Sequence, residues 1–323
     1  MSYLNWIRSK VGQRKIFLPF ASVILHDDQE RILLQRRTDL NVWGLPGGIL
    51  EIGEDILNCA RRELLVETGL IAGDLHLVGL YSDPRYDLVY PNGDEVQQYT
   101  LCFEGEVSGG KIQVDGIENS KQAFFEIGQI PLDEMPIWYA DMIHDYQRDQ
   151  LPAFSPAFSY ELTIDQIEDI RPIIGNSIYH GVGSAAVLVN PEGHLLMAQR
   201  TDNGYWHFPG GYMHIGENAA HAVIRELKEE TGLSITPVRI IGVMSPTEPW
   251  IYPNGDQVQG VVTFFLCRLT DEFADNEIQP DQAETIRARW IHPDQVMTYP
   301  THPRMAFVHL AILKHLEEGY FMI

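Results

Sequence analysis

Three glutamates of the sequence, Glu226, Glu229 and Glu230, are spaced at i, i+3 and i+4. On an α-helix this spacing places the three carboxylates on one face, within an arc of roughly 100°. Neighbouring carboxylates repel one another, and hard divalent cations such as Mg²⁺ bind to carboxylate oxygens. A cation held there can polarise a phosphoryl oxygen and lower the pKa of a bound water. The spacing therefore predicts a metal site that acts on phosphates; for three glutamates alone, a solvated acidic helix face is the alternative.

The residues around these glutamates extend the pattern. Backbone can approach a ligand closely at Gly211, because glycine has no Cβ, and Arg225 can hold a carboxylate bidentately, most simply that of Glu217. The sequence G-x5-E-x7-R-E-U-x-E-E-x-G-U, with U apolar, is filled by Gly211, Glu217, Arg225, Glu226, Glu229, Glu230 and Gly232, with Leu227 and Leu233 as the apolar residues. At a usage near 7% per residue type, seven fixed positions arise by chance at about 10⁻⁸ per starting residue.

This pattern is the Nudix box, and the sequence resembles the Nudix hydrolase family. The resemblance implies α/β/α sandwiches around a mixed sheet, and hydrolysis of a nucleoside diphosphate linked to another moiety, with Mg²⁺ or Mn²⁺ as cofactor. By position it implies metal ligands at Glu226, Glu229 and Glu230, with the carbonyl of Gly211 as a further one. Glu226 or an unidentified loop carboxylate would be the general base. The implied catalytic residues are Glu226, Glu230, Arg225 and Glu217, the last two orienting the cluster.

The chain contains the pattern twice. At a shift of 163, residues 43–70 match residues 206–233 at 14 of 28 positions. A repeat this long indicates a duplicated domain rather than a solenoid. We expect domains at 1–150 and 164–323, joined by a linker at 151–163 whose prolines disfavour a continuous helix.

The first copy of the box departs at one position. Val66 stands where the pattern has the first of its paired glutamates, and Glu63 and Glu67 remain at i and i+4 as expected ligands for one cation. We expect Val66 to be buried and to raise the cost of holding charge nearby. The first site is therefore predicted to be weak or inactive, and the alternative is that both copies turn over.

Each copy has the pattern of an α/β domain. Apolar strands are expected before the box, the box itself is expected to be a helix that ends at a left-handed glycine, and Asn-Gly pairs suit hairpin turns. The expected helices are 3–11, 55–68 and 136–146 in the first copy and 164–174, 218–231 and 304–317 in the second; the expected strands before the box are 17–25 and 31–35, then 184–189 and 194–199.

Three residues near the second box are candidates for binding substrate. Trp250 or Tyr252 can stack on a nucleobase, and packing of this hairpin against the core is the alternative. His214, in the loop before the box helix, is a candidate for contact with a phosphate, and a solvated loop histidine is the alternative. The substrate stays open among nucleotide sugars, ADP-ribose-like compounds and nucleoside triphosphates.

Composition restricts the partners. With 45 Asp and Glu against 23 Lys and Arg, the net charge is −22, which argues against duplex nucleic acid and anionic membranes as partners and leaves a small, metal-bound nucleotide. Three scattered cysteines and an N-terminal segment without an apolar signal core favour a soluble cytoplasmic protein.

The two copies are expected to pair as an intramolecular pseudo-dimer, and a homodimer is a further option. A nucleotide-binding sensor without turnover is the alternative function.

Overall fold

The computed structural model describes residues 1–113, 119–148, 152–270 and 278–323. It divides into two compact units, Met1–Phe154 and Ser155–Ile323, each of which is described by itself. The unit boundary falls within the segment 151–163 that was expected to be a linker.

The first unit is built on one mixed sheet. Its long strands β1 and β8 pair in parallel, and β2, β4 and β6 add antiparallel partners, so the path through the sheet is β10-β6-β8-β1-β2-β3. The helices are α1 (Tyr3–Val11), α2 (Ile56–Thr68) and α3 (Ile137–Tyr146). The strands are β1 (Ile16–His26), β2 (Ile32–Arg37), β3 (Trp43–Gly44), β4 (Gly47–Ile49), β5 (Leu70–Ala72), β6 (His76–Tyr81), β7 (Leu88–Val89), β8 (Glu95–Gly110), β9 (Asn119–Phe125) and β10 (Ala153–Phe154).

The second unit repeats this plan with its strands divided among three sheets, of which the largest follows the path β15-β12-β19-β17-β21. The helices are α4 (Gln166–Ile174), α5 (Ala219–Thr231) and α6 (Pro303–Lys314). The strands are β11 (Ser159–Ile164), β12 (Tyr179–Leu188), β13 (Leu195–Arg200), β14 (Trp206–His207), β15 (Gly210–Tyr212), β16 (Ile215–Glu217), β17 (Ile235–Met244), β18 (Trp250–Ile251), β19 (Gln257–Leu269), β20 (Thr285–Ile291) and β21 (Phe321–Met322).

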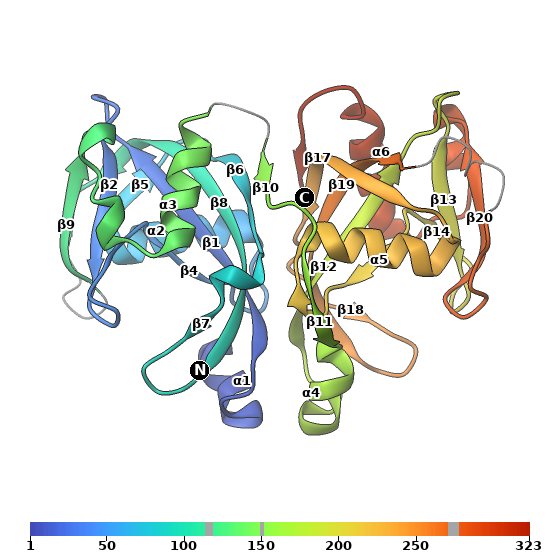
Figure 1. Ribbon diagram of the computed structural model, residues 1–323, viewed down its shortest axis with the longest axis horizontal. Coiled ribbons are helices and arrows are strands. Elements are labelled where there is room, and N and C mark those ends of the chain that lie inside the picture. The colour runs from blue at the N-terminus through green and yellow to red at the C-terminus, as the bar shows by residue number, and fades with distance from the viewer. Residues whose placement is uncertain (114–118, 149–151, 271–277) are drawn as a thin grey trace. The chain divides into compact units, whose positions relative to one another are not determined.

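Helices cover both faces of the large sheet in the second unit. Ala185 and Val187 of β12 belong to a core cluster that includes Val308 and Ile312 of α6. Successive side chains of a strand point to opposite faces, and α5 packs on β12 and β15 (Figure 1). The predicted α/β/α arrangement is therefore confirmed.

Both box helices end where the sequence predicts. Gly69 follows α2 with a φ of 72° and Gly232 follows α5 with a φ of 78°, the left-handed conformation that glycine adopts without strain. Side chains of Asp55 and Asn218 cap the N-termini of the two helices. The two box helices therefore begin and end at equivalent residues, and their glutamates occupy equivalent positions along the helix.

The segment 151–163 holds more structure than a linker. In its described part, β10 pairs with β6 of the first unit and β11 pairs with β16 of the second. Helix α4 begins at Gln166 rather than at 164, because Ile164 ends β11. Prolines disfavour a helix here, but they are tolerated next to edge strands.

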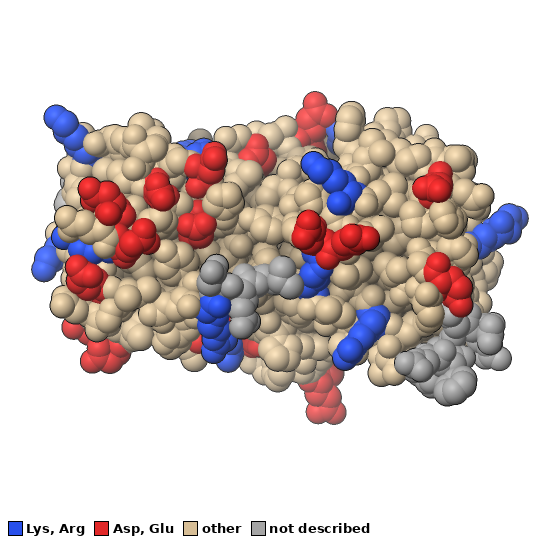
Figure 2. Space-filling model, turned by 90° about the horizontal axis from the view of Figure 1, so that it is seen from above, with Lys and Arg blue, Asp and Glu red and all other residues tan. Residues whose placement is uncertain are grey.

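Acidic side chains are spread over the surface of the described residues, as the excess of Asp and Glu in the sequence leads one to expect (Figure 2). On the face drawn in Figure 2, Asp and Glu side chains occur on both units, with Lys and Arg between them. Within the four described ranges, none of the helices is both long and apolar enough to cross a membrane.

Candidate active site

An ion pair between Arg225 and Glu217 anchors the second box. Arg225 Nη2 and Nε donate to the two oxygens of Glu217 at 2.6 and 3.1 Å. Burial acts to raise the pKa of the fully buried Glu217, but Arg225 and the hydrogen bonds from the N–H of His214 and the ring of His221 together outweigh it, so the pKa lies below its ordinary value. Arg225 Nη2 also donates to the carbonyl oxygen of Tyr212 at 3.0 Å, so it ties helix α5 to strand β15.

Glu226 and Glu230 are the buried carboxylates of the site, 8% and 2% exposed. Burial raises the pKa of Glu226 to about 7; the charges of Glu229 and Glu284 add to this, and Arg225 opposes it. Burial and the charge of Glu226 hold the pKa of Glu230 well above its ordinary value. Carboxylates buried this close to one another need a proton or a cation for balance.

Two features of this pair favour a cation. The Oε2 atom of Glu230 is buried and has no hydrogen-bond partner. A Cβ on Gly211 would lie 2.6 Å from the carboxylate of Glu226, so a larger residue at that position would displace this carboxylate. An unpaired buried oxygen in an oxygen-only group of ligands fits a hard divalent cation.

Glu229 stands apart from this buried pair. Its side chain is 57% exposed, and its Oε2 accepts a hydrogen bond from Arg225 Nη1 at 3.0 Å. Among the described residues, no three His, Cys, Asp or Glu side chains are grouped as a ready metal site. Glu229 would therefore have to leave Arg225 to join Glu226 and Glu230 as a third side-chain ligand.

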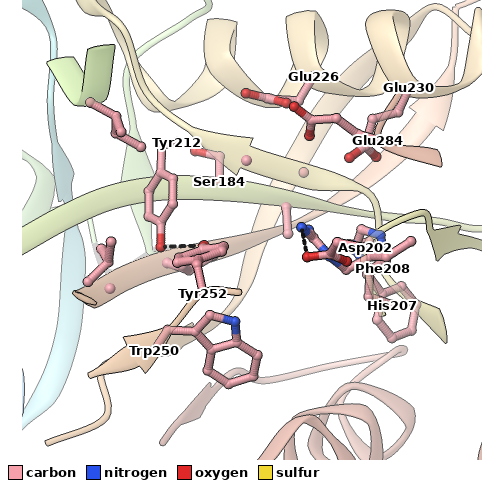
Figure 3. Close-up of a pocket in the computed structure, with 18 of the residues that line it drawn as sticks. Ser184, Asp202, His207, Phe208, Tyr212, Glu226, Glu230, Trp250, Tyr252 and Glu284 are labelled. Carbon is pink, nitrogen blue, oxygen red and sulfur yellow. Dashed lines mark hydrogen bonds and ion pairs between the residues drawn. The ribbon is translucent and has the colours of Figure 1, made fainter. Parts of the chain in front are cut away.

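A cleft of about 650 Å³ opens beside these carboxylates. Figure 3 shows Glu226, Glu230 and Glu284 gathered on one side of it, and Tyr212, Tyr252 and Trp250 on another. The hydroxyl oxygens of Tyr212 and Tyr252 lie 3.1 Å apart.

The three residues predicted to bind substrate all line this cleft. The ring of Trp250 contacts that of His302 in a tilted arrangement, with centroids 4.5 Å apart, and Tyr252 is half-buried beside Tyr212. His214 is half-buried, and its Nε2 lies 3.8 Å from a carboxylate oxygen of Asp165.

Glu284 is a residue of the site that the sequence reasoning missed. It is exposed in the turn before β20, lines the cleft, and its charge helps to raise the pKa of both Glu226 and Glu230. Asp281 shapes the turn, because its Oδ1 accepts a hydrogen bond from the N–H of Thr285 at 2.9 Å. The sequence carries no signal for Glu284, because it lies far from the box in an acidic loop.

Arg200 and Asp202 also line the cleft and were missed. Arg200 donates bidentately to Asp202 at 2.8 and 2.9 Å. Here the sequence held a usable signal, since Arg-Thr-Asp occurs in both copies, at 37–39 and at 200–202.

Two further polar groups of the cleft lack partners. The Oγ of Ser184 is buried and makes no hydrogen bond. His207 Nδ1 lies 2.9 Å from the carbonyl oxygen of Phe208 and must donate to it, so the shielded Nε2 keeps a free lone pair. Burial and the nearby Arg200 lower the pKa of His207 to about 3, which keeps the ring neutral. Ser184 and His207 therefore add unpaired hydrogen-bonding groups to the lining of the cleft.

In the first unit the box has the same scaffold. Arg62 donates to both oxygens of Glu54 at 2.8 Å and to Glu63 at 2.6 Å. The prediction that Val66 is buried is wrong, since its side chain is 64% exposed. It lies on the outward edge of the helix, as Glu229 does in α5, and does not desolvate the site.

The buried carboxylate of the first box is differently paired. Glu67 is 5% exposed, and its Oε2 accepts hydrogen bonds from Gln35 Nε2 at 2.8 Å and from the N–H of Gly47 at 2.9 Å. Glu63 and Glu67 were expected to hold one cation. The oxygen of Glu67 that faces Gln35 already has two donors, so this pair does not fit that role as well as Glu226 and Glu230 do.

Comparison with known proteins identifies the family. The NUDIX domain model matches residues 17–146 and 179–315. A Bacillus subtilis protein provisionally named as an 8-oxo-dGTP diphosphatase is 33% identical over 116 residues, 36% of this chain and 71% of that protein. A MutT-like protein of Streptomyces ambofaciens is 30% identical over 118 residues, 36% of this chain and 67% of that protein.

An ADP-ribose pyrophosphatase of Methanocaldococcus jannaschii is 30% identical over 127 residues, 39% of this chain and 70% of that protein. The family model covers both copies and most of the chain, and both copies carry the box on an equivalent helix. The chain therefore belongs to the Nudix family and is a tandem Nudix hydrolase.

Proposed function

We propose that the second unit hydrolyses the pyrophosphate linkage of a nucleoside diphosphate derivative, with Mg²⁺ or Mn²⁺ as cofactor. The observation that carries this proposal is the buried pair Glu226 and Glu230, with one unpartnered oxygen, at the edge of a cleft of about 650 Å³. A cleft of this size accommodates a nucleotide-sized ligand.

The cation would be held by Glu226 and Glu230, with Glu229 and the carbonyl of Gly211 as further ligands. When bound, the cation would polarise the phosphoryl oxygens and lower the pKa of a bound water. Arg225 would keep Glu226 in place through its 2.8 Å hydrogen bond, while Glu217 fixes Arg225. The carboxylate of Glu284 is our candidate for the loop base that accepts a proton from the attacking water.

The other side of the cleft would hold the nucleoside. Trp250, Tyr212 and Tyr252 offer aromatic surface for a base, and stacking of this kind is worth about 1–3 kcal/mol per base. The Nε2 of His207 can accept a hydrogen bond from an amino or imino group of the substrate. Negative surface charge elsewhere disfavours duplex nucleic acid as the substrate.

A substrate panel tests the proposal. ADP-ribose, nucleotide sugars, nucleoside triphosphates and 8-oxo-dGTP are incubated with the full chain and Mg²⁺, and the phosphate-containing products are quantified against an EDTA control. The names of the relatives suggest that ADP-ribose and 8-oxo-dGTP should be tried first. Metal-dependent cleavage of a pyrophosphate linkage supports the proposal. Tight binding without cleavage of any compound would instead favour a nucleotide sensor.

A further inference from the structure

The two boxes differ in the hydrogen-bond donors that surround one buried carboxylate. In the first unit, Oε2 of Glu67 accepts hydrogen bonds from Gln35 Nε2 at 2.8 Å and from the N–H of Gly47 at 2.9 Å. In the second unit the matching residue is Glu230, which accepts a hydrogen bond from the N–H of Gly210, the counterpart of Gly47, but whose Oε2 is buried without any partner. Both carboxylates are nearly inaccessible to solvent, at 5% and 2% exposure. The difference is therefore one of pairing and not of burial.

A single side chain on a neighbouring strand causes this difference. Gln35 lies on β2, is 2% exposed, and pairs across the sheet with Gly44 of β3. The matching residue of the second unit is Ala198 of β13, which pairs with His207 of β14. A glutamine is long enough to reach from the strand to the box helix, and an alanine is not.

We propose that the amide of Gln35 occupies the place of a cation in the first box, so that the first unit folds as a metal-free copy. Binding a cation at Glu67 would break a buried charge-assisted hydrogen bond and would leave the Gln35 amide without a partner. The rest of the box offers little in exchange. Glu63 is held by Arg62 at 2.6 Å just as Glu226 is held by Arg225 at 2.8 Å, and Val66 supplies no oxygen.

Mn²⁺ binding to the full chain tests this assignment without reference to activity. The second site is first disabled by Glu226→Gln with Glu230→Gln, and bound Mn²⁺ is then counted by electron paramagnetic resonance. We expect this parent to bind no Mn²⁺ at the first box. Adding Gln35→Glu replaces the donor by a carboxylate of the same size, and we expect it to create one Mn²⁺ site.

Thermal unfolding gives a second measurement on the same proteins. Two facing carboxylates should destabilise the Gln35→Glu protein, and Mn²⁺ should restore its Tm while leaving the parent unchanged. Should that variant not fold, Gln35→Ala removes the donor without adding charge. It should bind Mn²⁺ at the first box at concentrations at which the parent binds none, which corresponds to a gain in affinity of at least about 10- to 100-fold. Equal Mn²⁺ binding by the parent and by the Gln35 variants would overturn the proposal.

The reciprocal change transfers the amide to the second unit. Ala198→Gln is made together with His207→Gly, which reproduces the glycine found opposite Gln35, and Ala198→Met with His207→Gly is the control of similar volume that lacks a donor. We expect the glutamine variant to bind Mn²⁺ roughly 10- to 100-fold more weakly than the methionine variant. Equal affinities would contradict the role of the amide.

The role of Gln35 rests on the proposed function only in taking the second box as the example of a site that binds a cation. If the wild-type chain cleaves no nucleotide, the proposed function fails, whereas the Mn²⁺ count at the first box still decides the role of Gln35. The two failures are therefore distinguishable.

Discussion

The two box helices of this chain have the same length, the same type of N-cap and the same arginine–glutamate anchor, yet they surround their inner carboxylates differently. In the second unit, Glu230 keeps an unpartnered oxygen, and burial holds its pKa well above the ordinary value. In the first unit, Glu67 accepts a hydrogen bond from the N–H of Gly47, as Glu230 does from Gly210, and a second one from the amide of Gln35. A box motif is thus a scaffold, and the neighbouring strand decides whether its carboxylates are free to bind a cation.

The nucleoside side of the cleft differs as well. Tyr212 and Trp250 line the cleft of the second unit, and the matching residues of the first are Ile49 and Leu88. The cleft of about 650 Å³ lies within the second unit. The cleft of the second unit therefore has carboxylates on one side and aromatic side chains on another, whereas Ile49 and Leu88 at the matching first-unit positions are aliphatic.

Removal of the metal is expected to have the largest effect. Excess EDTA should reduce nucleotide cleavage to background, because the buried carboxylates cannot polarise a phosphate without a cation. Initial rates should return when Mg²⁺ or Mn²⁺ is added beyond the chelator. A cleavage rate that EDTA leaves unchanged would show that the second unit does not use its carboxylates in this way.

Loss of the proposed base should come next. Glu284→Gln keeps the size of the side chain and removes its ability to accept a proton, and we expect kcat to fall roughly 100- to 10,000-fold with folding intact. Glu192→Gln, at an exposed glutamate outside the cleft, is the control and should keep the wild-type kcat. A drop of less than twofold in the Glu284→Gln variant would assign the base elsewhere.

Loss of aromatic surface should have a smaller effect, on substrate binding. Trp250→Ala removes a stacking surface worth about 1–3 kcal/mol, so we expect KM to rise on the order of tenfold. Leu88→Ala changes the matching position of the first unit and should leave KM unaltered. Steady-state kinetics on both variants separates the two units, and equal changes in KM would remove the distinction between them.

Restoring the missing glutamate should have the smallest effect. Val66 is 64% exposed, so Val66→Glu can be accommodated without burying charge. We expect kcat to stay within about twofold of wild type, because the amide of Gln35 still pairs with Glu67. In a chain disabled at Glu230, a rise in activity on adding Val66→Glu would mean that the missing glutamate alone silences the first copy.

Local features of the site follow from the sequence. The ends of the box helices, their glycine caps and the pairing of Arg225 with Glu217 depend on residues at most a few turns apart, so the pattern predicts them directly. The exposure of Val66 does not follow. Three residues sharing roughly a 100° arc on a helix can have either edge turned to solvent, and tertiary packing selects which.

Long-range contacts account for what the sequence could not predict. Gln35 and Glu67 are 32 residues apart, and their side chains meet only because the fold brings the strand β2 within reach of the last turn of α2. Glu284 reaches the site through the pairing of β20 with β13, in which Arg200 lies opposite Thr285. The residues of the box do not determine how β20 pairs with β13, so the box pattern alone does not predict that Glu284 lies in the site.

The most direct measurement of the difference between the two copies is a matched pair of substitutions. Glu230→Gln and Glu67→Gln each replace one oxygen of a buried carboxylate by an amide nitrogen, at equivalent positions of the two boxes. Both proteins are assayed with Mg²⁺ on the substrate of the panel that the wild-type chain cleaves fastest. We expect Glu230→Gln to remove most of the cleavage and Glu67→Gln to remove little. Equal losses in the two proteins would contradict the asymmetry between the two units.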